Sequence, residues 1–132
     1  METQNNEQQI KTLVDNWAKA VRAKDITGVL ADHSPDILLF DVPEPFQSKG
    51  IDAYRISWED VFFPWYGDDG NFEVNDLQVT AGTDAAFCTG IISCSGTTDG
   101  EKVSLKVRLT IGLVKTGGRW IVKHEHHSEV SK

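Results

Sequence analysis

Residues 101–128, EKVSLKVRLTIGLVKTGGRWIVKHEHHS, decide the fold. From Val103 to Leu113 every second residue is apolar, and Ser, Lys, Arg and Thr fill most of the positions between. This alternation predicts a strand with one face on a core. Thr116-Gly117-Gly118 predicts a tight hairpin turn, so residues 119–128 should form an antiparallel partner strand.

Two further strands are predicted upstream, over residues 72–81 and 85–95. Short turns join them to each other and, through GTTDG, to the hairpin, so neighbouring strands should pair antiparallel. The alternation of the first slips at Asn75-Asp76, which predicts a β-bulge.

The first third of the chain has a helical pattern. Apolar residues spaced by three and four predict a helix over residues 6–23. Asp25 is a suitable N-cap for a short second helix that ends near His33, because Pro35 prevents its continuation.

A short strand and a third helix complete the pattern. Residues 36–41, DILLFD, read as a strand, and the loop VPEPFQSKG follows. Residues 51–62 predict a helix that Pro64 ends, with large rings on one face. The expected fold is α+β: three N-terminal helices pack on a curved, mainly antiparallel sheet, forming a cone with an internal pocket. We expect one domain over residues 1–132, with residues 1–5 disordered.

Four stretches together resemble SnoaL-like proteins of the nuclear transport factor 2-like superfamily, which also contains ketosteroid isomerase. They are LLFDVPEPFQSKGIDAY, RISWEDVFF, VSLKVRLTIGLVK and the closing strand from Gly118 to Ser128. The resemblance implies a cone-shaped, cystatin-like roll, a pocket between helices and sheet, and a homodimer formed through the outer sheet face. It does not imply one activity, because the superfamily includes isomerases, cyclases, hydrolases, dehydratases and non-enzymatic modules.

The composition of the chain limits the classes of partner that it can bind. The net charge of −7 and pI of about 4.9 argue against nucleic acid and anionic membranes, which require clustered basic residues. No apolar run approaches the roughly 20 residues of a membrane span, and the polar N-terminus lacks a signal core, so we expect a cytoplasmic protein. Cys88 and Cys94 share one predicted strand roughly 20 Å apart, which favours two thiols over a disulfide.

Asp41, at the end of the first strand, is the candidate general base. A carboxylate beside apolar walls can have a raised pKa and move a proton; the alternative is a turn residue that bonds its own loop amides. In the similar sequences this aspartate points inward. His124 and His126 share one face of the last strand and are candidate acid-base groups, with Glu125 and His127 on the other face. Alternatively, one imidazole merely organises the pocket floor.

We expect no metal, because only Asp41 or His33 is available as a third ligand beside the two histidines. Arg108 is a fourth catalytic candidate, as a clamp for a carboxylate or enolate oxygen. Arg108 alternates with the apolar residues of its strand, which favours a position on the outer face and in a dimer interface. The resemblance favours a buried role, so both positions remain open.

Rings on the third helix are candidate substrate-binding residues, although some must be core; they are Tyr54, Trp58, Phe62, Phe63 and Trp65. Trp17 and Trp120 are expected in the core. No nucleophile or phosphate-loop motif is present. We therefore expect a small-molecule-binding protein without a cofactor, and an isomerase or lyase that moves protons on a small apolar carbonyl compound. The alternative is a non-catalytic binding or interaction module.

Overall fold

Strands β3 to β6 form the sheet that the sequence predicts after residue 70. They are antiparallel neighbours with the bounds β3 (Asn71–Ala81), β4 (Ala85–Thr98), β5 (Glu101–Thr116) and β6 (Arg119–Ser128). Gly117 and Gly118 both have positive φ, as a tight hairpin turn requires. The predicted bulge in β3 is confirmed, because its register with β4 shifts between Asn75 and Gln78.

The structure, a computed structural model, describes residues 2–130, with side chains from residue 5 onward. The remaining elements are α1 (Glu2–Arg22), α2 (Ile26–Leu30), β1 (His33–Phe40), β2 (Ser48–Lys49), α3 (Ile51–Ile56), η1 (Ser57–Phe62) and α4 (Phe63–Tyr66). Residues 2–5, which we expected to be disordered, belong to α1; residue 1 lies outside the described residues.

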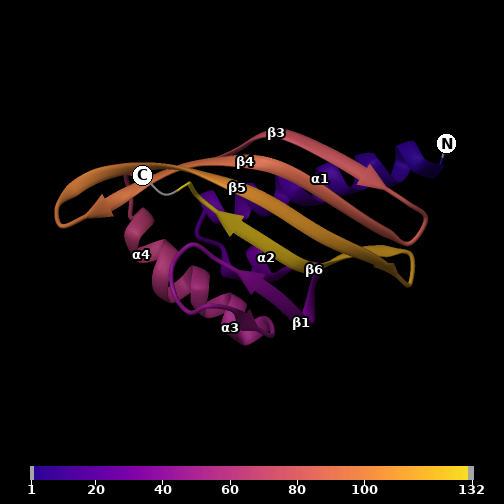
Figure 1. The fold of residues 1–132 in the computed structure, drawn as a ribbon, viewed down its shortest axis with the longest axis horizontal. Coiled ribbons are helices and arrows are strands. Elements are labelled where there is room, and N and C mark those ends of the chain that lie inside the picture. Colours follow the sequence, from indigo (N-terminus) through magenta and orange to yellow (C-terminus); the bar gives the residue numbers. More distant parts are fainter. Residues whose placement is uncertain (1, 131–132) are drawn as a thin grey trace.

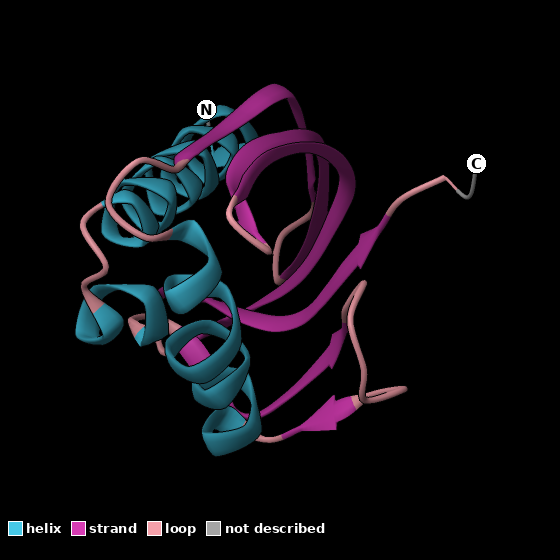
Figure 2. Ribbon diagram, turned by 90° about the vertical axis from the view of Figure 1, so that its left-hand side faces the viewer, coloured by secondary structure: helices cyan, strands magenta, loops and turns pink. Residues whose placement is uncertain are grey.

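The six strands form one sheet in the order β2-β1-β6-β5-β4-β3, and β1 pairs parallel to β6. Figure 1 shows β3 to β6 as long strands that cross the molecule together. Figure 2 shows the strands curling while the helices gather on one side of them. The predicted α+β cone with a mainly antiparallel sheet is confirmed.

The core lies between α1, the third helical segment and the inner face of the sheet. The predicted stripe of α1 is buried, with Ile10, Val14 and Val21 at 0% exposure. On β5, alternate residues from Val107 to Leu113 are buried as the sequence predicts. Each such side chain contributes about 1.5–3 kcal/mol by leaving water. Trp17 and Trp120 are core residues, as expected.

The second helix is shorter than predicted. It ends at Leu30, and β1 begins at His33, so Pro35 lies inside a strand. The pairing of β1 with β6 is irregular between His33 and Leu38. Pro35 therefore falls where the ladder is interrupted, which is where a strand tolerates a residue without an N–H.

Pro64 does not end the third helix. The chain continues from α3 through η1, a π-helical segment, into α4, where Pro64 occupies the first turn. Proline is tolerated in a first turn, and a π segment inserts extra backbone that shifts which side chains face the core. Val61, which would share a face with Trp58 three residues earlier in a regular helix, is 45% exposed as a result.

One bulge in β6 changes the faces of the functional residues. Leu113 pairs with Val122, whereas Gly112 pairs with His124, so Lys123 is an extra residue without a partner on β5. An extra residue reverses the alternation beyond it. Trp120 and Val122 face inward before the bulge; Glu125 and His127 face inward after it.

Candidate functional site

A cavity of about 300 Å³ lies between η1, α4 and the inner face of the sheet. Its walls are mostly apolar; they are formed by Val42, Pro43, Trp58, Val61, Phe62, Trp65, Phe72, Ile92, Leu105 and Val107. Asp41, Ser57, Cys94 and His127 supply the polar atoms. The predicted pocket therefore exists in the structure, and its charged groups come from the ends of β1 and β6.

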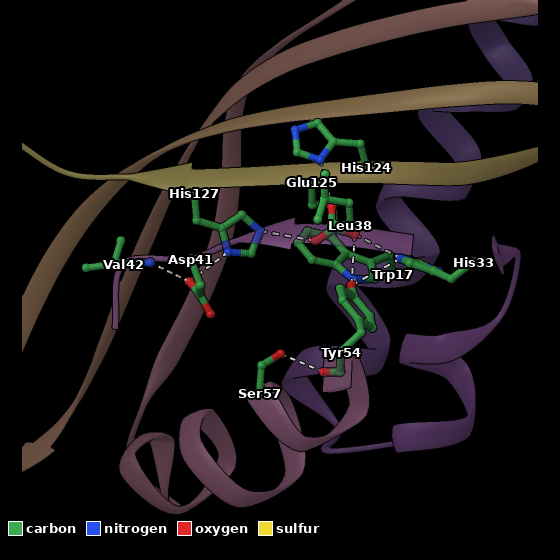
Figure 3. Close-up of polar contacts among 10 residues, drawn as sticks. All are labelled: Trp17, His33, Leu38, Asp41, Val42, Tyr54, Ser57, His124, Glu125 and His127. Carbon is green, nitrogen blue, oxygen red and sulfur yellow. Dashed lines mark hydrogen bonds and ion pairs between the residues drawn. The ribbon is translucent and has the colours of Figure 1, made fainter. Parts of the chain in front are cut away.

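Asp41 follows β1 directly and is 22% exposed at its side chain. Its Oδ1 accepts hydrogen bonds from the backbone N–H of Val42 at 2.8 Å and from His127 Nδ1 at 3.2 Å. Oδ2 accepts none from the described residues. In Figure 3 this second oxygen points away from His127, toward the helical side of the site. Asp41 thus combines the expected turn contact with an oxygen left for a ligand.

His127 is buried between two carboxylates (Figure 3). Its Nδ1 faces Asp41, and its Nε2 lies 3.1 Å from Glu125 Oε1. Burial alone would lower the pKa of His127, but the hydrogen bonds to Asp41 and Glu125 outweigh it and raise the pKa to about 9. The two carboxylates therefore favour the protonated form of the imidazole, which can donate from both nitrogens.

Glu125 has 0% exposure and three hydrogen-bond donors. Oε1 faces His127, while Oε2 accepts from Tyr54 Oη at 2.8 Å and lies 2.9 Å from His33 Nε2. Burial would raise the pKa of Glu125, but the contacts with His127 and His33 lower it to about 2. Burial beside Glu125 also raises the pKa of Tyr54 well above its usual value, so the phenol stays a donor.

Aromatic rings form the opposite wall of the cavity. Trp58 packs edge-on against Phe62 with ring centroids 5.1 Å apart, and Phe62 lies 5.6 Å from Trp65. Such rings favour a flat apolar ligand. Trp58 Nε1 is buried and has no hydrogen-bond partner among the described residues. Cys94 also lines the cavity, and burial raises the pKa of its thiol to about 11.

The structure brings some of the predicted site residues together. Asp41, Trp58, Phe62 and Trp65 line the cavity. Tyr54 lies behind it, where its Oη accepts a hydrogen bond from Trp17 Nε1 at 3.0 Å. Phe63 is buried in the core rather than in the cavity wall, since consecutive residues of a helix point about 100° apart and Phe62 faces the cavity.

The predicted positions of His124 and His126 are wrong. The bulge at Lys123 turns both to the outer face, where His124 Nδ1 bonds the Leu38 carbonyl at 2.7 Å and His126 is exposed. Arg108 is also exposed on the outer face, and its Nε donates to Ser128 Oγ at 3.2 Å. The alternation of β5 correctly predicts that Arg108 lies on the outer face. The prediction that Arg108 acts as a clamp inside the pocket is wrong.

The residues that take those places are Glu125, His127 and His33. The sequence placed Glu125 and His127 together on one face, but on the opposite one, and His33 was considered only as a metal ligand. A run of five ionisable residues, from Lys123 to His127, marks the region, but it does not say which face of the strand is buried.

Cys88 and Cys94 are buried free thiols, as predicted. Among residues 2–130 there is no cluster of three His, Cys, Asp or Glu side chains arranged to hold a metal ion. Over the same range no helix combines the length and apolar character that a membrane span needs.

Comparison with known proteins agrees with the fold described above. Residues 10–131 match the SnoaL-like domain. A solved NTF2-like protein of unknown function from Pseudomonas putida KT2440 is 32% identical, with a TM-score of 0.87 over 98% of this chain and 89% of that one. No curated protein matches significantly.

Two more distant structures share the fold. A ketosteroid isomerase-like protein from Erwinia carotovora atroseptica SCRI1043 is 21% identical, with a TM-score of 0.77 over 96% of this chain and 97% of that one. The CaMKII hub of S. rosetta is also 21% identical, with a TM-score of 0.78 over 94% and 96%. Since the family match spans nearly the whole sequence, the chain belongs to the SnoaL-like family of NTF2-like proteins.

Proposed function

We propose that this protein binds a small, largely apolar carbonyl compound and moves a proton on it, as an isomerase or lyase that uses general acid-base chemistry. The observation that carries the proposal is the Oδ2 of Asp41, which lies at the charged end of an apolar cavity and accepts no hydrogen bond from the described residues. A carboxylate next to a carbonyl compound can remove the proton on the carbon adjacent to the carbonyl.

The surrounding residues suit this role. His127 and the Val42 N–H both hold Oδ1, so the carboxylate plane is fixed and Oδ2 has one direction to face. Fixing a reacting group in this way lowers the entropy cost of the reaction. The aromatic wall of Trp58, Phe62 and Trp65 excludes water from the bound ligand, which strengthens electrostatic interactions there.

Asp41→Asn tests the proposal because it retains the shape and removes the base. Native protein and variant would be compared on a panel of activated ketones and lactones, with ligand binding followed separately by thermal shift. We expect turnover to fall about 10²–10⁴-fold while stabilisation by the ligand persists. Unchanged turnover in the variant would remove Asp41 from the mechanism.

A second candidate is binding without turnover. It is favoured by the scarcity of acids in the cavity: besides Asp41 and His127, the polar lining consists of Ser57 and Cys94, and Ser57 Oγ already donates to the Tyr54 carbonyl at 2.5 Å. This reading predicts saturable stabilisation by a ligand that is recovered unchanged, and no turnover of any panel compound by native protein.

We also infer a homodimer through the outer face of the sheet. That face carries Phe87 at 51% exposure, which is paired with Gly112, together with His124 and, further along β5, the exposed Arg108. A sheet with helices on one side leaves such a face to water or to a partner. Light scattering that gives a monomer mass at micromolar concentration would contradict the dimer.

A further inference from the structure

Four ionisable side chains form one continuous chain of contacts that leads away from the cavity. It runs from Asp41 to His127 (3.2 Å), to Glu125 (3.1 Å) and to His33 (2.9 Å). The side-chain exposures are 22%, 7%, 0% and 1% in that order, so Asp41 is the end that reaches the cavity. At the other end His33 Nδ1 lies 2.7 Å from the Ala31 carbonyl oxygen.

Donor and acceptor rules fix the number of protons in this chain. A carbonyl oxygen only accepts, so His33 Nδ1 carries a hydrogen. Each of the three contacts between an imidazole nitrogen and a carboxylate oxygen also needs one hydrogen, since two lone pairs facing each other repel. With Asp41 and Glu125 ionised, the hydrogens in both contacts of His127 lie on its imidazole, so His127 donates from both nitrogens.

We propose that Glu125 and His33 are positioning residues, which keep His127 doubly protonated so that it donates to Asp41 and cannot itself accept the substrate proton. The proposal rests on the proposed function, and adds that His127 is a fixed donor while Asp41 is the base. Tyr54 supports the arrangement, because its Oη donates to the same Glu125 oxygen that His33 contacts.

No other described group competes for this role. From η1, Trp58 presents its ring to His127 with centroids 6.2 Å apart. From β4, Cys88 lies within electrostatic reach of Glu125, and Cys94 within reach of Asp41 and the exposed Glu129; burial raises the pKa values of the two thiols to about 12 and about 11, so both are uncharged. The charge of His127 is therefore set by Asp41 on one side and by Glu125, with His33 and Tyr54 behind it, on the other.

The test is ¹⁵N NMR of histidine-labelled protein as a function of pH, with no ligand added. We expect both His127 nitrogens to carry protons in native protein at pH 7, and Glu125→Gln to lower the midpoint of its titration by one unit or more, in line with the loss of one neighbouring opposite charge. Glu101→Gln is the control, since Glu101 is an exposed acid at the start of β5 and its loss should leave His127 unchanged.

Tyr54→Phe provides a second variant in case Glu125→Gln does not fold. It removes one donor to Glu125 and should shift the titration in the same direction by a smaller amount. A His127 that is singly protonated in native protein at pH 7, or a midpoint that neither variant moves, would overturn the proposal. Because the measurement needs no substrate, a protein without turnover would refute the proposed function and leave this result intact.

Discussion

His127 Nδ1 lies 3.2 Å from Asp41 Oδ1 because each residue is one step beyond the last pairing between the parallel strands β1 and β6. Phe40 of β1 is paired with His126 of β6, and Asp41 and His127 are the next residue on each. The site is therefore positioned by main-chain pairing between strands far apart in sequence. Changes to that pairing should affect the site more than changes to the loop after Asp41.

The stability of the protein should depend on pH in two directions. The pKa of His127 is raised from 6.5 to about 9, so its contribution is complete below pH 6.5 and is lost as pH rises through 9. The pKa of Glu125 is lowered from 4.5 to about 2, so its contribution is present above pH 4.5 and is lost as pH falls toward 2.

We therefore expect the free energy of unfolding to be greatest between about pH 4.5 and pH 6.5, as measured by urea denaturation at a series of pH values. The losses of stability at low pH and at high pH arise from one shared set of contacts, so the two contributions do not add. In His127→Gln the decline between pH 6.5 and 9 should flatten. An equally steep alkaline decline in that variant would assign it to another group.

Truncating Glu125 should destabilise the fold strongly. Glu125→Ala leaves His33, His127 and the Tyr54 hydroxyl buried without their common acceptor. Removing one partner of a buried charged network costs about 3–5 kcal/mol. Urea denaturation at pH 6 would measure the loss, and Glu129→Ala on the exposed end of the chain should change stability by less than about 0.5 kcal/mol. A loss of similar size in both variants would contradict the role of the network.

Filling the cavity should abolish ligand binding without unfolding the protein. Leu105 is half-buried and lines the cavity, so Leu105→Trp places an indole where the ligand would lie, at a stability cost of about 1–3 kcal/mol. Lys106→Trp is the matched control, because Lys106 is exposed on the outer face of the same strand. Thermal shift with any ligand that stabilises native protein should show no response for Leu105→Trp and a normal response for Lys106→Trp. A normal response in both would place the ligand outside this cavity.

The fold was predictable because its signals are local, and the site was not because its geometry depends on one non-local event. The alternation from Val103 to Leu113 reports directly which side of β5 is buried, and it also placed Arg108 outward. On β6 the same alternation, counted onward from the inward-facing Trp120 and Val122, places His124 and His126 on the inner face, whereas the structure places His127 there. Lys123 has no sequence signal as a bulge; its status follows from how β6 registers with Gly112 and Leu113.

Deleting Lys123 tests that explanation most directly. If Lys123 is the extra residue, its deletion closes the bulge and leaves Leu113 opposite Val122 and Gly112 opposite His124. The alternation then runs unbroken from Val122 to Glu125 and His127, so both side chains should stay on the inner face and keep the buried network. We expect the deletion variant to fold, to retain the His127 imidazolium signal, and to be close in stability to Lys123→Ala, which removes the same exposed ion pair with Asp36 but retains the bulge. Urea denaturation and the amide and histidine NMR spectra of the two variants make the comparison. A deletion variant that loses the fold or the His127 signal, while Lys123→Ala keeps both, would show that Lys123 is not the extra residue of β6.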